Sequence, residues 1–456
     1  MSSLYKIFSK NIKKEPNKIF IYSFNQTFNG NNCKKKISFL RSFIKKNKIR
    51  NIGINYENSA DWFFWYLAAD SYDCQVVLIK NGTAKNELNK IKAKYKIDYI
   101  ASKIPQTLNL KLKINNNNKN KRRDILFTSG SLSLPKGVIV SEKAYLHVAK
   151  ILVKKLKQKD NDIELLSMPF DHSFGLVRLR CCILAGTKIF ISDGLKKFPE
   201  IFKFSQENKL SGLSLVPSGL ELIKFLLKNK ANLFAKKINY IEIGSSHINK
   251  EVRIWLKKNF SKTNIIHHYG MTEASRSFLL PRGKNDDLKK NINLIGKIIP
   301  GCKYKIDETN SELLLKGKNL FEGYFDQENN RFIDGWFRTR DIVKKKLNEL
   351  YLVGRADNQF NIGGNKIQAE MIEDLIEDIN HVKRCVCFTQ PDKIYGNSLA
   401  LIVENKNIVK TDNILKIIKK KLINLPDYYI PKKIFFKKVL LTKNGKKIRT
   451  PQKIFY

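Results

Sequence analysis

The sequence is poor in acidic residues, in paired cysteines and in long apolar runs. It has 41 Asp and Glu against 86 Lys and Arg, so its 456 residues carry a formal charge of +45. The seven cysteines are odd in number and include no C-x-x-C pair, which favours neither a disulfide framework nor a zinc site. The most apolar segment, 62–69, is far shorter than the ~20 residues that span a bilayer. Residues 1–10 lack the apolar run of a signal peptide, so we expect a cytoplasmic location.

The excess positive charge permits two interpretations. It is typical of proteins that bind nucleic acid or an anionic membrane surface. The lysines, however, are spread along the whole chain among many Asn and Ile residues, without an arginine-rich tail or a helix with a single basic face. A codon bias toward Lys, Asn and Ile gives the same pattern, and we favour it over a nucleic-acid role. The positive field still favours anionic substrates such as nucleotides.

Strands and helices alternate along most of the chain before Leu294. Strands are expected at residues 52–56, 75–79, 97–100, 125–127, 164–168, 188–191, 212–216, 240–243 and 264–268. The intervening segments include an apolar helix around 62–69 and a helix that Ser141 caps and that runs through Leu156. This alternation predicts parallel sheets covered by helices. The low-complexity stretch 115–123 is expected to be a surface loop.

The pattern changes after Leu294, where short strands and glycine turns predict a small β-rich subdomain. Beyond a boundary near 354–357, an amphipathic helix, two strands and a second helix predict a compact α+β unit. The fold class is therefore α/β, with a large N-terminal domain of parallel and mixed sheets over residues 1–356. Residues 357–456 form the small C-terminal domain.

One loop has the composition of a phosphate-binding segment. An apolar strand ending at Phe127 leads into Thr-Ser-Gly-Ser-Leu-Ser-Leu-Pro-Lys-Gly, residues 128–137. Small hydroxyl residues and glycine let consecutive backbone N–H groups point at one spot, and Lys136 closes the loop, which is how chains bind phosphate oxygens. It is not a Walker A loop, because Lys136 follows Pro135 rather than glycine. Taken alone, the loop fits a phosphate site and an ordinary surface turn equally well.

Five further segments give this loop a context. In chain order they are His-Tyr-Gly-Met-Thr-Glu at 268–273, Ser-Glu-Leu-Leu-Leu-Lys-Gly at 311–317 with Gly-Tyr at 323–324, Trp-Phe-Arg-Thr-Arg-Asp at 336–341, the glycine-containing stretch 354–373, and Thr-Lys-Asn-Gly-Lys at 442–446. Together with 128–137 they resemble, in order and spacing, the signatures of the adenylate-forming superfamily. That superfamily comprises acyl-CoA synthetases, luciferases and peptide-synthetase adenylation domains, and the resemblance covers nearly the whole chain.

The resemblance implies how ATP is held. The phosphates are expected to contact Thr128, Ser129, Gly130, Ser131 and Lys136. In the second segment, Tyr269 is expected to stack on adenine beside Gly270, Thr272 to contact the α-phosphate, and Glu273 to ligate Mg²⁺ as a hard oxygen donor. Outside such a motif, a residue like Tyr269 is more often packed in the core, and one like Glu273 is more often a solvated surface residue.

The later segments imply the ribose contact and the catalytic lysine. Asp341 is expected to accept hydrogen bonds from the ribose hydroxyls with help from Arg355, although Arg355 also fits a structural ion pair. Lys446 is expected to neutralise charge that develops during the first step. Its neighbours Lys443 and Lys447 are alternatives, but the Asn-Gly turn before Lys446 presents that side chain at a loop tip.

Other residues imply the acid and thiol sites. The stretch 169–175 resembles an acyl-CoA synthetase element that places His172 beside the carboxylate pocket, whereas Asp171 would suit an amino-acid substrate. Gly244, with the two serines after it, is expected to line the acyl pocket. Gly364, in the pair 363–364, is expected to border the pantetheine passage. The flanks of that pair look most like o-succinylbenzoate–CoA and fatty- or aryl-acid–CoA ligases.

Two positions depart from the superfamily pattern. Leu132-Ser133 stands where Thr-Gly is usual in the phosphate loop, which removes a hydroxyl donor and adds a side chain. Arg340 replaces the usual glycine before Asp341. Neither change removes a charged catalytic group, so we expect activity to be retained.

The resemblance implies an AMP-forming acid–thiol ligase that uses ATP, Mg²⁺ and coenzyme A. Its first partner is a small-molecule carboxylic acid, and its C-terminal domain is a mobile lid that rotates about Asp357 between two half-reactions. Two alternatives stay open. One is a ligase that loads an acyl carrier protein, and the other is a non-catalytic or nucleic-acid-binding descendant.

Overall fold

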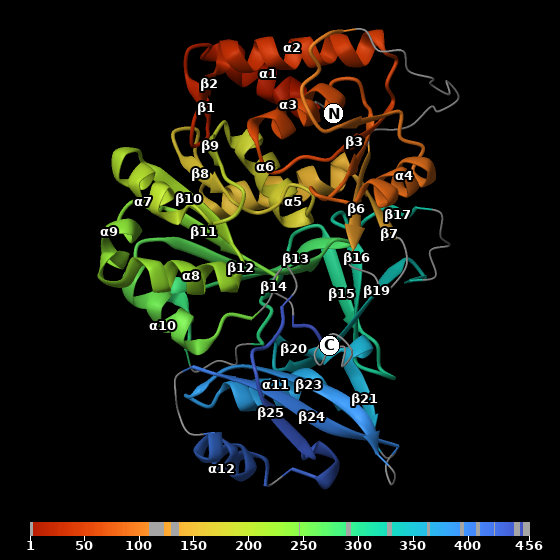
Figure 1. The fold of residues 1–456 in the computed structure, drawn as a ribbon, viewed down its shortest axis with the longest axis vertical. Helices are drawn as coiled ribbons and strands as arrows, with labels where there is room; N and C mark the ends of the chain where they lie inside the picture. Colours follow the sequence, from red (N-terminus) through yellow and green to blue (C-terminus); the bar gives the residue numbers. More distant parts are fainter. Residues whose placement is uncertain are drawn as a thin grey trace. The chain divides into compact units, whose positions relative to one another are not determined.

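The computed structural model has the predicted α/β architecture of large sheets with covering helices (Figure 1). It describes residues 3–108, 123–128, 136–245, 247–288, 293–325, 331–362, 365–392, 396–406, 411–423, 425–441 and 447–449. The chain divides into two compact units, of which the first comprises Met1–Lys303 with Leu315–Phe337 and the second Tyr304–Leu314 with Arg338–Tyr456. The predicted domains, 1–356 and 357–456, stay a prediction.

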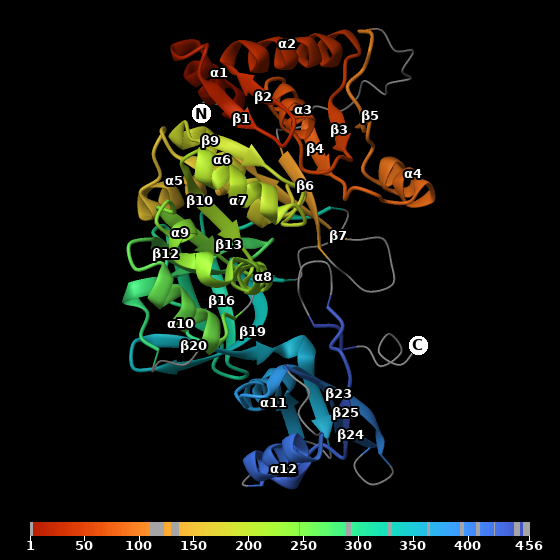
Figure 2. The same cartoon turned by 60° about the vertical axis from the view of Figure 1, so that its left-hand side comes forward.

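A nine-stranded sheet forms the centre of the first unit (Figure 2). In spatial order its strands are β14 (Lys297–Ile298), β13 (Ala274–Pro281), β12 (Asn264–Met271), β11 (Tyr240–Ile243), β10 (Leu210–Leu215), β8 (Ile163–Leu166), β9 (Lys188–Ile191), β1 (Ile19–Tyr22) and β2 (Thr27–Asn29). The strands from β12 to β1 are parallel, and the edge strands are antiparallel. The carboxyl ends of β8, β10, β11 and β12 therefore share one edge of the sheet.

The first unit also contains a six-stranded sheet. Its spatial order is β17 (Gly323–Tyr324), β7 (Lys136–Ser141), β6 (Arg123–Thr128), β4 (Gln75–Leu78), β3 (Asn51–Ile54) and β5 (Tyr99–Ala101). Strands β3 to β6 pair in parallel, whereas β7 pairs antiparallel with both neighbours.

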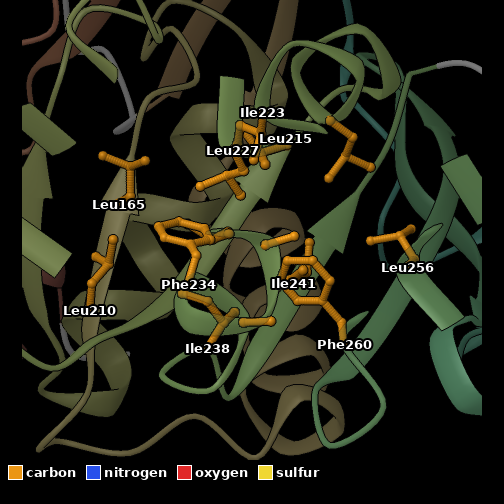
Figure 3. Packing of buried hydrophobic residues seen from close by; sticks show 14 of the residues in the cluster. Leu165, Leu210, Leu215, Ile223, Leu227, Phe234, Ile238, Ile241, Leu256 and Phe260 are labelled. Carbon is orange, nitrogen blue, oxygen red and sulfur yellow. The ribbon is translucent and has the colours of Figure 1, made fainter. Parts of the chain in front are cut away.

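Helices cover these sheets. They are α1 (Leu4–Lys14), α2 (Gly30–Lys46), α3 (Ala60–Asp70), α4 (Lys85–Lys94), α5 (Glu142–Leu156), α6 (Ser173–Ala185), α7 (Phe198–Glu207), α8 (Pro217–Leu227), α9 (Ala231–Ala235) and α10 (Lys250–Asn259), with 3-10 turns at Lys228–Lys230 and Gly283–Asn285. Most of them are amphipathic, whereas α3 and α6 are buried on nearly all sides. Helix α8 shows why the amphipathic helices pack: Leu220, Ile223 and Leu227 recur at helical spacing and are buried. Figure 3 shows Ile223 and Leu227 packed beside Leu215 of β10 in the core.

A five-stranded sheet links the two units along the chain. Its strands are β15 (Cys302–Ile306), β16 (Glu312–Gly317), β19 (Trp336–Lys346), β18 (Phe332–Ile333) and β20 (Glu349–Arg355). The remainder of the second unit contains β21 (Gln359–Ile362), β22 (Asn365–Gln368), α11 (Ala369–Glu377), β23 (Val382–Asp392), β24 (Gly396–Asn405), α12 (Thr411–Leu422) and β25 (Lys433–Phe436), with 3-10 turns at Ala356–Asn358 and Asp427–Tyr429. Its core packs α11 and α12 on the sheet β23-β24-β25.

Most predicted elements are confirmed, and two details are wrong. The predicted strands at 188–191 and 240–243 coincide with β9 and β11, and Ser141 caps α5 by accepting a hydrogen bond from Ala144 N. Arg123, expected in a surface loop, instead begins β6. Lys136, expected to close a loop, instead begins β7, because it pairs with Thr128 in an antiparallel ladder.

Two further structural findings concern membrane-spanning helices and the cysteines. Within the described ranges, no helix combines the length and apolar character that crossing a bilayer requires. All seven cysteine thiols are free.

A buried ion pair connects helix α6 to strand β6 of the six-stranded sheet. Arg180 on α6 binds the carboxylate of Asp124 on β6, and the Tyr66 hydroxyl also donates to that carboxylate at 2.8 Å. Arg180 and Asp124 are at most 1% exposed. Removing one partner from such a pair leaves the other charge buried and uncompensated.

Asp124→Asn is therefore expected to lower the free energy of unfolding by about 3 kcal/mol, measured by urea denaturation. Glu207→Gln is the matched control, since the Glu207 carboxylate makes an exposed pair with Lys203 that is worth less than about 1 kcal/mol. Equal losses in the two variants would contradict a structural role for the buried pair.

Candidate active site

The predicted acid and adenine residues lie at the carboxyl edge of the nine-stranded sheet. His172 follows β8 and is the residue before the first turn of α6, Gly244 directly follows β11, and Tyr269 lies near the end of β12. Side chains after parallel strands meet at this edge, where open α/β sheets bind their ligands. A contact shows that the start of α6 lies close to β13. The Arg276 guanidinium of β13 donates a hydrogen bond to the Ser173 carbonyl at 2.8 Å.

Thr272 and Glu273 are the two residues of a tight turn between β12 and β13. Met271 pairs with Ala274, and the ladder shifts register between Tyr269 and Met271. Gly270 occupies that irregularity, where a Cβ atom would lie only 2.4 Å from the backbone nitrogen of Arg276. The glycine is thus required by close backbone approach, and the turn projects from the ligand-binding edge.

Tyr269 stands beside this turn with its ring half-buried. The ring makes an edge-to-face contact with Phe278 of β13, with centroids 5.8 Å apart and an interplanar angle of 72°. Phe278 is buried in the core, so the contact fixes the orientation of the tyrosine ring.

Glu273 is held by two side chains that the sequence analysis assigned no role. The Tyr324 hydroxyl donates to Glu273 Oε1 at 2.9 Å, and the Arg331 guanidinium lies 3.5 Å from the same oxygen. Arg331 also donates to the Tyr324 hydroxyl at 2.8 Å. Burial, together with the Glu273 carboxylate, raises the pKa of Tyr324, so the phenol keeps the proton that it donates.

The residues present fit a magnesium ion shared with substrate phosphates. The described part of the chain holds no cluster of three His, Cys, Asp or Glu side chains that could bind a metal by themselves. Glu273 does offer one carboxylate, 7% exposed, at the ligand-binding edge. Mg²⁺ is commonly bound in this way, by one or two carboxylates with phosphate oxygens and water. Arg331 supplies positive charge to the same carboxylate.

The predicted phosphate residues are only partly described. Thr128 is the last residue of β6 and pairs with Lys136, the exposed first residue of β7. Ser129, Gly130, Ser131 and the unusual pair 132–133 lie outside the described residues. Gly137 is explained by packing, since a Cβ atom there would lie 2.6 Å from the Tyr95 ring.

In the second unit, Asp341 and Arg355 are directly paired across β19 and β20. Arg355 Nη1 donates to Asp341 Oδ1 at 2.8 Å, and the Asp341 residue is 4% exposed. Arg355 thus forms an ion pair, which was the alternative interpretation of this residue. Arg340 has φ +62°, which lies in the left-handed region that favours glycine. This conformation explains why the usual residue before Asp341 is glycine.

Of the candidate lysines of the C-terminal segment, the structure describes only Lys447. Lys447 Nζ lies 2.9 Å from Glu373 and 2.7 Å from Glu377, and Arg449 also binds Glu373. Burial opposes the charge of Lys447, but the two carboxylates raise the pKa of Lys447 overall. Lys447 is therefore engaged within its own unit. Lys446 and Lys443 lie outside the described residues, as does Gly364.

A buried polar cluster beside the predicted acid pocket was missed from the sequence. Glu242 of β11 is fully buried and contacts Arg276 at 3.0 Å, His268 at 2.7 Å and Arg178 at 3.4 Å. The sequence did contain a sign of this cluster. A glutamate interrupts the apolar strand Tyr-Ile-Glu-Ile, and arginines interrupt the apolar helix α6. Charged residues at such positions must be paired, but their partners depend on the tertiary fold.

Arg340→Gly is expected to raise the free energy of unfolding by about 1 kcal/mol, because glycine adopts positive φ without the penalty of a Cβ atom. Arg340→Ala separates this effect from loss of the charged side chain, since it keeps the Cβ atom and should give no stabilisation. Chemical denaturation of the three proteins checks both statements. Equal stabilisation by alanine would show that the backbone is not strained.

Comparisons with known proteins agree with this geometry. A model of the AMP-binding enzyme family matches residues 8–325. The 2-succinylbenzoate–CoA ligase of Haemophilus influenzae is 29% identical over 399 residues, which cover 84% of this chain and 83% of that protein. The D-alanine–D-alanyl carrier protein ligase of Bacillus licheniformis is 24% identical over 345 residues, covering 71% of this chain and 68% of that protein.

Solved structures share the fold. The o-succinylbenzoate CoA synthetase (MenE) from Bacillus subtilis, in complex with an acyl-adenylate intermediate, superposes with a TM-score of 0.82 at 18% identity, covering 99% of this chain and 98% of that chain. ATP-bound MatB from Rhodopseudomonas palustris gives 0.80 at 15% identity, covering 98% and 97%. The family match spans more than half of the sequence and includes the strands and turn that carry Tyr269 and Glu273. The chain therefore belongs to the AMP-binding enzyme family.

Proposed function

We propose that this chain is an AMP-forming acid–thiol ligase that activates a carboxylic acid with ATP and transfers the acyl group to coenzyme A. The observation that carries the proposal is the meeting of an acid-site histidine, an adenine-site tyrosine and a single carboxylate at one sheet edge. His172 lies before the first turn of α6, whereas Tyr269 and Glu273 belong to the β12–β13 hairpin. The Arg276 side chain of β13 joins the two by donating to the carbonyls of Ser173 and Phe174.

In the first step, an oxygen of the substrate carboxylate attacks the α-phosphorus of ATP and pyrophosphate leaves. The bond that forms joins the acyl oxygen to phosphorus, and the bond that breaks releases the β-phosphate oxygen. The protein contributes positioning and charge rather than covalent chemistry. Tyr269 would orient the adenine, Thr272 the α-phosphate, and His172 the attacking carboxylate.

Three positive charges would act on the phosphates in this step. Lys446 would neutralise charge that develops at the α-phosphate and the acid. Lys136 and the backbone of 128–131 would hold the β- and γ-phosphates. Mg²⁺ held by Glu273 would neutralise phosphate charge and polarise the phosphoryl oxygens.

In the second step, the CoA sulfur attacks the acyl carbon, the thiol proton is released to solvent, and AMP leaves with the electron pair of the broken bond. The lid, residues 357–456, would rotate about Asp357 so that Gly364 borders the thiol passage. Asp341 would hold the ribose hydroxyls while Arg355 orients its carboxylate. The location is proposed to be cytoplasmic, where free cysteines persist.

A carrier protein is the second candidate acceptor. The observation that favours it is the likeness to a D-alanyl carrier protein ligase. A chain with a formal charge of +45 also suits an acidic carrier.

The proposed function is tested by a pyrophosphate-release screen over aryl, short-chain and long-chain acids. We expect release that depends on one class of acid, followed by acyl transfer to CoA in a thioester assay. Pyrophosphate release without acyl transfer to CoA, but with acyl transfer to a phosphopantetheinylated carrier, would show that the acceptor is a carrier protein. Acid-independent ATP hydrolysis would contradict the proposal.

Lys446→Ala is expected to abolish adenylate formation but to spare thioester formation from supplied acyl-adenylate, because Lys446 acts only in the first step. Lys443→Ala is the matched control and should change neither half-reaction by more than about twofold. Separate assays of the two half-reactions check this division. Equal loss of both in Lys446→Ala would rule it out.

Glu273→Gln is expected to raise the Mg²⁺ concentration required for half-maximal activity on the order of tenfold, because a neutral amide binds the cation less strongly. Binding of Mn²⁺ in the presence of ATP, followed by electron paramagnetic resonance, gives a readout independent of turnover. Glu322→Gln serves as control, since Glu322 pairs with Arg123. Unchanged cation binding in Glu273→Gln would remove Glu273 as a ligand.

A further inference from the structure

The imidazole of His268 lies directly on Gly244 at the carboxyl edge of the sheet. Strands β11 and β12 are parallel neighbours in which Ile243 pairs with His267, so Gly244 and His268 come next on the two strands (Figure 1). A Cβ atom at position 244 would lie 2.1 Å from His268 Cε1 and 2.2 Å from Nε2. Glycine at 244 thus leaves the space that the ring fills, and the two residues form one wall.

Two contacts fix the orientation of this ring. His268 Nδ1 lies 2.7 Å from Glu242 Oε1. Phe174 of α6 meets the imidazole edge-to-face, with centroids 4.8 Å apart and an interplanar angle of 87°. Phe174 is two residues beyond His172, which is the expected wall of the carboxylate pocket. The ring therefore stands between both expected walls of the acid site.

The charges around His268 balance when the imidazole is neutral. Glu242 pairs with Arg276, and Glu164 pairs with Arg178, which also approaches Glu242. These two carboxylates and two guanidinium groups are at most 2% exposed. Burial lowers the pKa of His268 despite the opposing effect of Glu242, so the ring carries one proton at neutral pH.

The position of that proton leaves an acceptor at Nε2. An ionised carboxylate 2.7 Å from Nδ1 requires the proton on Nδ1, and a neutral imidazole then has a lone pair on Nε2. Among the described residues Nε2 has no hydrogen-bond partner, and His268 is 8% exposed.

The neighbouring arginine is not available to a ligand. Arg276 uses Nε on Glu242, Nη1 on the Ser173 carbonyl at 2.8 Å, and Nη2 on the Phe174 carbonyl at 2.9 Å. A second carboxylate on the substrate would therefore face a lone pair without a cation to pair with. A hydroxyl or an amide N–H would instead donate to Nε2.

We propose that His268 is a specificity-determining residue whose Nε2 accepts a hydrogen bond from the substrate. The substrate is accordingly a carboxylic acid with a hydroxyl or amide N–H group remote from its reacting carboxylate. This inference rests on the proposed function and on the expected acid walls at His172 and Gly244.

The test compares acids that differ at a single position. Three matched sets place hydrogen, hydroxyl or carboxylate on the same carbon: propionate, 3-hydroxypropionate and succinate; hexanoate, 6-hydroxyhexanoate and heptanedioate; benzoate, 3-hydroxybenzoate and isophthalate. We expect kcat/KM for pyrophosphate release to be on the order of tenfold higher for the hydroxyl member of the set that fits the pocket. A preference for the unsubstituted or dicarboxylic member would overturn the inference.

Two substitutions assign the preference to His268. His268→Phe keeps a ring without an acceptor, so the ratio of kcat/KM for the hydroxyl acid to that for the unsubstituted acid should fall close to one. His268→Gln keeps an acceptor, so it should retain part of the preference for the hydroxyl acid. Calorimetric binding of the same acids, in the presence of a non-hydrolysable ATP analogue, should follow the same order. A hydroxyl preference that survives in folded His268→Phe would overturn the role of His268.

Failure of the proposed function has a different signature. No pyrophosphate release with any acid of the three sets and of the wider screen would overturn the ligase assignment, and this inference with it. Release with a different order of preference overturns only the inference. Thermal denaturation of both variants establishes that they are folded, and the comparison within wild-type protein does not depend on either variant.

Discussion

The buried carboxylate of Glu242 is the charge on which the candidate acid site depends. It contacts Arg276 of β13, His268 of β12 and Arg178 of α6, so one residue of β11 connects three other elements. Burial of such a charge costs several kcal/mol unless it is fully paired. Burial would raise the pKa of Glu242, yet Arg276, His268 and Arg178 lower the pKa of Glu242 overall. The pairing thus keeps the carboxylate ionised and fixes the edge of the sheet against the helix that follows β8.

The second unit uses the same physical device around a different carboxylate. Glu373 of α11 is 1% exposed and accepts from Cys387 N at 2.8 Å, while Lys447 and Arg449 bind its oxygens. Because the side chains of residues 447 and 449 both bind Glu373, they anchor the chain directly after Lys446.

The sequence predicted the architecture better than the chemistry of individual contacts. Strand and helix periodicity located elements such as β9, β11 and α5, because burial of one face dictates the pattern of apolar residues. The motif of 268–273 located the turn that carries Glu273. Periodicity carried no information on Arg331, which reaches Glu273 from a distant segment, or on the pairing of Glu242 with Arg276. Such contacts depend on how strands far apart in the chain are placed side by side.

The central claim is that a carboxylate oxygen attacks the α-phosphorus of ATP. The most direct measurement uses an acid substrate labelled with ¹⁸O in its carboxylate, with mass spectrometry of the nucleotide products after transfer to a thiol. The proposed chemistry predicts one labelled oxygen in AMP and unlabelled pyrophosphate. Label in inorganic phosphate with formation of ADP would indicate an acyl-phosphate route and would contradict the assignment of this site.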